Sequence, residues 1–155
     1  MSTDEDNPGV VAPPPLVYLG AILVGALMER LWRWRLPTGR VGTVAGGVLI
    51  VGAILLFVWA LREFDRARTS PMPHKPTTAM VTSGPFRFTR NPIYVAFTLV
   101  HLGIALWTSS AWLLATIAPA LLVIRFGVIA REERYLDRKF GAEYRAYRRD
   151  VRRWL

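Results

Sequence analysis

The chain has 155 residues, of which 52% are apolar and 20% are charged, and its formal net charge is +9. The apolar residues gather in long blocks separated by arginine-rich segments. This pattern is typical of a membrane protein rather than a nucleic-acid-binding protein, because arginines that flank apolar spans meet anionic lipid. The chain contains no cysteine, which excludes disulfides, thiolate nucleophiles and cysteine-based metal sites. We expect a membrane protein that binds neither nucleic acid nor a metal.

The beginning of the chain is acidic and then rich in proline, and we expect a mobile tail over residues 1–15. Its charge is opposite to that of a secretory signal peptide, so we expect no cleavage. Residues 16–155 are interpreted as a single membrane domain. Its first span covers about residues 16–34, because the apolar part alone is short and arginine side chains can extend from a span to the interface. An interfacial helix is the alternative for this segment.

The second predicted span, about residues 41–61, is an uninterrupted apolar run long enough to cross about 30 Å of hydrocarbon. Within it, Gly42 and Gly46 have the spacing that lets two helices approach closely. The connection that follows, residues 62–91, is polar, and loops of this length are usually functional or disordered. We interpret it as a cap over a site, and its prolines are Pro71, Pro73, Pro76 and Pro85.

The next segment carries no charged side chain between residues 91 and 124, apart from the mostly neutral His101, and is too long for one crossing. Because residues 108–110 are polar, we predict a tight helical hairpin with arms at about residues 92–107 and 111–129. A basic helical tail over residues 131–155 follows. The predicted fold is an all-α integral membrane protein with about four transmembrane helices. His101 is interpreted as a core histidine rather than a site residue.

The distribution of positive charge predicts the orientation of the chain. Positive residues are most frequent in the 62–91 connection and in the tail, and the positive-inside rule therefore places both, and both termini, in the cytoplasm. The smaller group that disagrees, on the predicted outer side, is Arg30, Arg33, Arg35 and Arg40.

The polar stretch before the hairpin has the features of a helix start at a membrane surface. Asn91 is a suitable N-cap residue, and Pro92 would occupy the first helical position, where its missing N–H costs nothing. Free backbone N–H groups and the positive end of the helix dipole would then point back at Arg87 and Arg90. This arrangement predicts a site for an anionic group.

The hairpin should also bring its own two ends together. Arg125 precedes Glu132 by seven residues, which places both on roughly one helix face, and an arginine inside a span is a functional candidate. The alternatives are that Arg125 extends to the interface and that the two glutamates are solvated. The polar residues expected to meet are Arg90, Asn91 and Tyr94 at the entrance and Arg125, Glu132 and Glu133 at the exit.

Two ordered motifs resemble a known superfamily. Residues 84–94 read Gly-Pro-Phe-Arg-Phe-Thr-Arg-Asn-Pro-Ile-Tyr, which is similar to the glycine-proline-aromatic, Arg-His/Asn-Pro-x-Tyr signature of isoprenylcysteine carboxyl methyltransferases and phospholipid methyltransferases. Asn91 stands where prenylcysteine enzymes usually carry histidine, which resembles bacterial-type members and puts prenylcysteine specificity in doubt. The second motif is matched by Glu132-Glu133, Leu136, Phe140-Gly141, Glu143-Tyr144 and Tyr147. The resemblance covers roughly residues 40–155.

The resemblance implies a membrane-embedded methyltransferase that uses S-adenosylmethionine and acts on a lipid or lipid-like acceptor, a carboxylate or an amine. It also implies a site at the cytoplasmic face of the bacterial cytoplasmic membrane. By motif position the cofactor pocket would contain Gly84, Arg90, Asn91, Pro92, Tyr94, Glu132 and Glu133. Catalytic candidates are Arg125, which could orient an acceptor carboxylate, and Glu133 or Tyr94, which could take a proton.

Two other functions stay open at the level of the sequence. One is an NADPH-dependent membrane reductase, and the other is a non-catalytic adaptor that presents its basic tail to anionic lipid. The acceptor, the methylated atom, the oligomeric state and the roles of Tyr144 and Tyr147 are not decided by these patterns.

Overall fold

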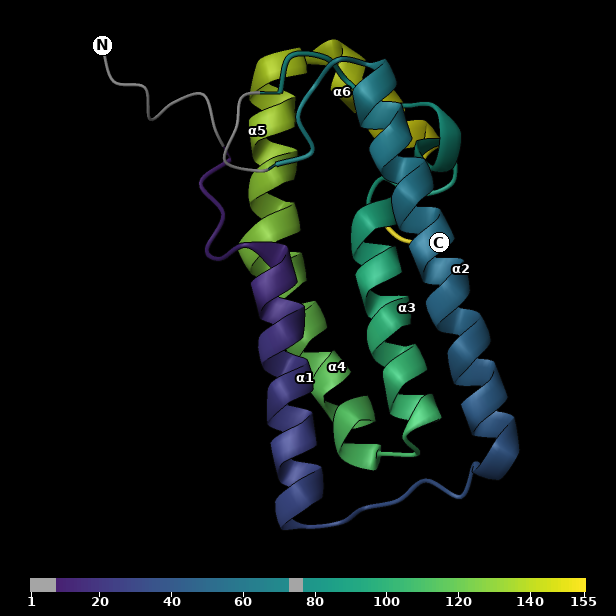
Figure 1. Ribbon diagram of the computed structural model, residues 1–155. Helices are drawn as coiled ribbons and strands as arrows, with labels where there is room; N and C mark the ends of the chain where they lie inside the picture. The colour runs from purple at the N-terminus through teal and green to yellow at the C-terminus, as the bar shows by residue number, and fades with distance from the viewer. Residues whose placement is uncertain (1–7, 73–76) are drawn as a thin grey trace.

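The computed structural model describes residues 8–72 and 77–155, and helices make up most of them (Figure 1). The predicted all-α membrane protein is confirmed. Three helices in the described ranges are long and apolar enough to cross a membrane, namely Pro14–Leu31, Gly39–Arg66 and the continuous Ala111–Phe140, while Pro92–Trp107 is a shorter apolar helix. The elements are α1 (Pro14–Leu31), α2 (Gly39–Arg66), the short 3₁₀ helix η2 (Gly84–Arg87), α3 (Pro92–Trp107), α4 (Ala111–Val123), the π-helical segment η3 (Ile124–Ile129), α5 (Ala130–Phe140) and α6 (Ala142–Asp150).

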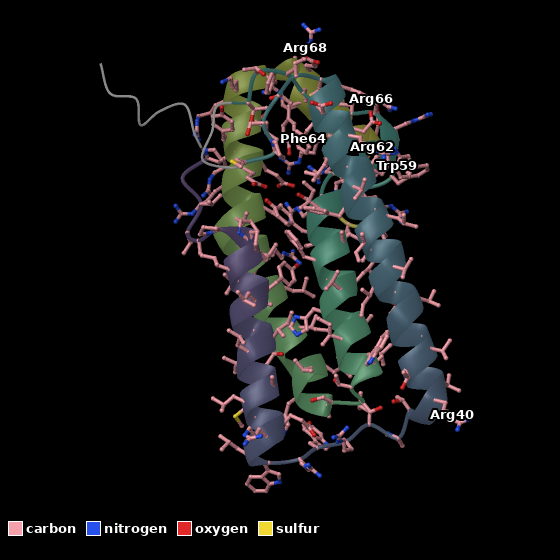
Figure 2. All side chains as sticks on the ribbon, in the orientation of Figure 1. Arg40, Trp59, Arg62, Phe64, Arg66 and Arg68 are labelled. Carbon is pink, nitrogen blue, oxygen red and sulfur yellow. The ribbon has the colours of Figure 1, made fainter. Side chains whose placement is uncertain are left out.

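The long helices form an antiparallel bundle in which α1 packs mainly on α4 and α2 packs mainly on α3. In Figure 1, α5 and α6 lie at the end of the bundle where α2 finishes, and the link between α1 and α2 lies at the other end. Figure 2 shows Arg62, Arg66 and Arg68 at the first of these ends and Arg40 at the second. The arginines of α2, together with Arg68 just after it, are therefore divided between the two ends of the bundle.

Small residues account for the close contact between α2 and α3. A Cβ atom at Gly46 would fall on the Gly103 carbonyl oxygen and the Trp107 backbone, and one at Gly103 would meet the Ile50 side chain. The helices approach closely here because neither glycine carries a side chain, as the small-residue spacing of Gly42 and Gly46 predicts.

The first and second helices differ in length from their predictions. α1 ends at Leu31 rather than Trp34, and Trp32 already has an extended backbone. The link that follows is tied to the turn between α3 and α4, because Arg35 contacts Glu29 at 3.2 Å and donates to the Thr108 carbonyl at 2.9 Å. Glu29 in turn accepts from Ser110 at 2.8 Å. α2 continues past Leu61 to Arg66.

The predicted basic tail is not separate from the last apolar helix. α4 passes through η3 into α5 without a break and ends at Phe140, and Gly141 then turns the chain into α6 with a positive φ of 53°. Glycine adopts this conformation without the steric cost that a Cβ atom brings. The final residues, 151–155, return to the start of α3.

Part of the predicted N-terminal tail, residues 1–7, lies outside the described residues, as do Pro73 and Pro76 of the connection. Residues 8–13 lead into α1 along the η3 segment, where the Val11 N–H donates to the Gly127 carbonyl at 3.2 Å.

Candidate active site

A pocket lies where α3 begins and α5 passes it, at the end of the bundle that carries α6. The end of α2 and the connection after it supply most of its apolar wall, including Phe64 of α2 and Met80 and Val81 of the connection. The polar residues that line it are Ser70, Thr77, Arg90, Asn91, Tyr94, Glu132, Glu133, Tyr135, Tyr144 and Tyr147. The two ends of the predicted hairpin therefore contribute to one pocket.

Tyr94 joins the first turn of α3 to α5. Pro92 occupies the first helical position, as predicted, and the following turn buries Tyr94 to 8% exposure. Its hydroxyl donates to Glu132 Oε1 at 2.6 Å. Hydrogen bonds to ionised groups are shorter and stronger than neutral ones, so this contact fixes the position of the Glu132 carboxylate.

Glu133 is held by two arginines. Arg153 donates from Nε to Oε1 at 2.9 Å and from Nη2 to Oε2 at 2.7 Å, and Arg90 Nη1 lies 3.1 Å from Oε1. The side chains of Glu133 and Arg90 are only 11% and 10% exposed. The hydrogen bonds that Arg153 donates to Glu133 raise the pKa of the Arg153 guanidinium, which therefore stays charged.

The C-terminal residues are bound to the start of α3 through main-chain atoms. The Arg90 N–H donates to the Arg152 carbonyl at 2.9 Å, and the Arg153 carbonyl accepts from the Asn91 side-chain amide at 2.8 Å and from the Thr89 hydroxyl at 3.1 Å. Asn91 is at the N-cap position, but among the described residues its side chain makes no capping bond. The predicted cap is thus replaced by a tertiary contact.

Two tyrosines of α6 complete the polar wall. The Tyr147 hydroxyl donates to the Phe86 carbonyl at 2.7 Å, and Arg90 Nη1 donates to the Tyr144 hydroxyl at 3.3 Å. Burial raises the pKa of both phenols, and the negative charge of Glu133 adds to the rise at Tyr144. Both side chains therefore remain protonated at neutral pH, and they hold α6 and the η2 turn beside Arg90.

Gly84 is near the pocket but is not among the residues that line it. Its φ is +58°, and a Cβ atom there would meet the Glu63 side chain and the Trp59 indole nitrogen. Glu63 is 3% exposed and accepts a hydrogen bond from the Ser83 hydroxyl. The glycine that begins the predicted motif thus permits a tight turn against the end of α2.

Arg125 lies outside the pocket. It is exposed, it stacks at 5.4 Å from the centre of the Phe126 ring, and it lines a lateral groove between α3 and α4 with Leu99 and Trp154. The expectation that Arg125 and Glu132 share one face assumed a regular α-helix. Arg125 lies inside the π-helical segment η3, and the wider π-helical turn between Arg125 and Glu132 changes the direction in which Arg125 points relative to Glu132.

His101 is fully buried, and its Nε2 lies 3.3 Å from the Thr116 hydroxyl on α4. The Tyr18 ring of α1 contacts its edge, with ring centres 6.4 Å apart. This position between three helices agrees with the interpretation of His101 as a core residue.

Sequence reasoning missed Arg153 as part of this cluster and left Tyr144 and Tyr147 without a role. The two tyrosines lie within a motif that the sequence does show, so their spacing from Glu132-Glu133 was a usable signal. For Arg153 the sequence offers only a basic tail, with no spacing that relates it to Arg90.

The pocket fits a ligand that carries both a negatively and a positively charged group. In the described part of the chain, the buried Nε of Arg90 has no hydrogen-bond partner. A buried charged N–H without a partner is costly, so an anionic group beside it would be stabilising. The Glu132 carboxylate lines the same pocket and can accept from an ammonium group or a hydroxyl.

Comparison with known proteins adds two findings. The sequence pattern of the family described as phospholipid methyltransferase matches residues 41–143, which include Arg90, Asn91, Tyr94 and both glutamates. An uncharacterized protein of Haemophilus influenzae is 49% identical over 65 residues, which are 41% of this chain and the whole of that protein. No solved structure matches the chain.

Proposed function

Because the chain belongs to the phospholipid methyltransferase family, we propose that it transfers a methyl group from S-adenosylmethionine to a lipid or lipid-like acceptor. The observation that carries the proposal is the pocket at the start of α3, where Arg90, Tyr94 and Glu132 converge on a space beside apolar side chains. Methyl transfer of this kind requires alignment of donor and acceptor and the exclusion of water more than it requires a covalent nucleophile.

S-adenosylmethionine, when bound, supplies a methyl group on a positively charged sulfur. On our proposal Arg90 holds its carboxylate, Glu132 receives its ammonium group or ribose hydroxyls, and Asn91 and Pro92 form the adjacent wall. The aromatic and apolar residues of the 62–91 connection exclude water from this space. Gly84 supports the wall indirectly through the turn against Glu63.

The acceptor is proposed to approach from the bilayer. The lateral groove between α3 and α4 is lined by apolar side chains and by one cation, Arg125, which is suited to the acidic or phosphate group of an amphiphile. If the acceptor is an amine, a proton must leave it, and Glu132 is better placed to take it than Glu133, either directly or through the Tyr94 hydroxyl, which would pass its own proton to Glu132. Both oxygens of Glu133 are already bonded to guanidinium groups.

Four membrane crossings with both termini in the cytoplasm are part of the proposal. The pocket, the 62–91 connection, α6 and the start of α1 lie at one end of the bundle, which carries most of the positive charge. Arg35 lies at the other end, and its charge is paired with Glu29. This pairing lowers the excess of positive charge on the predicted outer side, which was the feature that disagreed with this orientation. We propose a bacterial cytoplasmic membrane as the location.

The test is calorimetric binding of S-adenosylhomocysteine and, separately, of NADPH to the detergent-purified protein. We expect binding of the first alone, with a loss of at least about tenfold in affinity for Glu132→Gln and no change for Glu143→Gln, which removes an exposed carboxylate of α6. NADPH binding alone would replace the proposal with a reductase. Binding of neither to a folded sample would favour a non-catalytic adaptor.

The class of acceptor is tested with labelled S-adenosylmethionine and vesicles. One set carries phosphatidylethanolamine as an amine acceptor, and a second carries oleate as a carboxylate acceptor. Label in the extracted lipid of either set identifies the class, and label in neither set, from protein that binds S-adenosylhomocysteine, would contradict a simple amine or carboxylate lipid as acceptor.

A further inference from the structure

Arg153 lies beyond residues 41–143, which the family pattern matches, and it is not among the residues that line the pocket. We propose that Arg153 is a positioning residue. It binds both carboxylate oxygens of Glu133, so that the Arg90 guanidinium remains available to the carboxylate of the methyl donor. The inference rests on the proposed function and deepens it. It gives the two neighbouring glutamates different tasks, with Glu132 facing the ligand and Glu133 ordering the arginines.

The charge of the cluster is the first argument. One carboxylate, Glu133, faces two guanidinium groups, which leaves one positive charge in excess. Arg153 takes both carboxylate oxygens, at 2.9 and 2.7 Å, whereas Arg90 makes a single contact at 3.1 Å. The excess charge therefore resides mainly on Arg90, whose side chain is 10% exposed and so has little hydration from bulk water.

The second argument is the unused donor on Arg90. Its Nε is buried, and none of the residues that the structure describes accepts a hydrogen bond from it. Guanidinium groups bind carboxylates through paired N–H donors, and Arg90 lines the pocket. The Tyr144 hydroxyl, 3.3 Å from Arg90 Nη1, helps to hold the guanidinium in place without neutralising it.

Removal of the Arg153 charge would take the excess positive charge out of the pocket. Arg90 and Glu133 would then form a closed neutral pair. A ligand carboxylate would lose the attraction of Arg90, while a ligand ammonium group would meet the same or a stronger attraction. The carboxylate and the ammonium group of the ligand should therefore respond differently to the loss of the Arg153 charge.

The position of the C-terminal residues does not depend on the Arg153 side chain alone. The Arg153 carbonyl accepts from Asn91 and Thr89, and the Arg152 carbonyl accepts from the Arg90 N–H. These are main-chain acceptors that any substitution retains. A change of the Arg153 side chain therefore tests its charge while the chain stays attached to α3.

The experiment compares two ligands by calorimetry with the full-length protein in detergent. One is S-adenosylhomocysteine, and the other is its analogue that lacks only the carboxylate. The proteins are the wild type, Arg153→Gln, Arg153→Lys, and Arg149→Gln as a control that removes a positive charge from an exposed position of α6. Thermal unfolding of each variant is measured in parallel.

We expect Arg153→Gln to lower the affinity for S-adenosylhomocysteine by about tenfold or more. The affinity for the decarboxylated analogue should stay the same or increase. Arg153→Lys should recover part of the lost affinity because it restores the charge without the side-on geometry. Arg149→Gln should match the wild type. Equal weakening of both ligands by Arg153→Gln would show a merely structural role, and no effect on either would also overturn the inference.

Failure of the proposed function gives a different result. If the wild-type protein binds neither ligand, both the methyltransferase proposal and this inference are wrong. If the wild type binds S-adenosylhomocysteine but Arg153→Gln keeps its preference over the decarboxylated analogue, the function stands and only the role of Arg153 is wrong.

Discussion

The Tyr94 hydroxyl donates a 2.6 Å hydrogen bond to Glu132, across 38 positions of the sequence, and so connects the first turn of α3 to α5. It is the contact that brings the two motifs of the chain into one wall of the pocket. Tyr94→Phe removes the donor while keeping the ring. The buried Glu132 oxygen then loses its partner, and we expect affinity for S-adenosylhomocysteine to fall about tenfold in calorimetry.

The control for this variant is Tyr18→Phe. Tyr18 on α1 also hydrogen-bonds into α3, at 2.7 Å from the Thr98 hydroxyl and 3.3 Å from the Tyr94 main-chain carbonyl, but it does not contact the Tyr94 hydroxyl and does not line the pocket. We expect it to lower thermal stability and to leave ligand affinity unchanged. The same loss of affinity in both variants would mean that Tyr94 acts on the bundle as a whole rather than on the site.

Glu133→Gln should behave differently from Glu132→Gln. It leaves two guanidinium groups without a counter-charge, and we expect a loss of about 2–3 kcal/mol in the free energy of unfolding, moderated because Arg153 is 29% exposed. Glu132→Gln should lose ligand affinity with a smaller loss of stability. Denaturation of both variants in the same detergent checks this, and equal stabilities would contradict the ordering role of Glu133.

Arg125→Gln should impair methyl transfer to the acceptor without changing the affinity for the methyl-donor ligand. Because Arg125 lies in the lateral groove and not in the pocket, we expect affinity for S-adenosylhomocysteine to stay within about twofold of the wild type. Transfer of labelled methyl groups to the vesicles should fall through a raised KM for the acceptor. Arg138→Gln, an exposed charge on α5, serves as the control. A loss of affinity for S-adenosylhomocysteine in Arg125→Gln would show that Arg125 acts on the pocket, which contradicts its proposed role in the lateral groove.

Gly46→Ala should destabilise the contact between α2 and α3. The added methyl group falls on the Gly103 carbonyl and the Trp107 backbone, and overpacking of this kind costs about 1–3 kcal/mol. Gly52→Ala, on the same helix with open space around it, should be neutral or stabilising by about 0.5–1 kcal/mol. Thermal unfolding of the two variants tests this prediction. Similar melting temperatures would show that α2 and α3 can move apart without a loss of stability.

Much of the architecture follows from the sequence because it depends on local properties. Long apolar runs must form helices in a membrane, since every backbone polar group has to be satisfied within the segment. Pro92 fixes the start of α3, and Gly42 and Gly46 mark the face of α2 that meets a neighbour. The order of the two motifs also indicated that Arg90, Tyr94 and the glutamates would lie in one pocket.

The tertiary structure decided the features that depend on residues far apart in the chain. The return of residues 151–155 to α3 pairs Arg153 with Glu133 and takes the Asn91 amide away from its expected capping role. The π-helical segment that contains Arg125 directs this side chain to the lateral groove, because the wider turn changes its direction relative to Glu132. Periodicity fixes which face of a helix is apolar, whereas these contacts depend on how separate helices and the chain end meet in space.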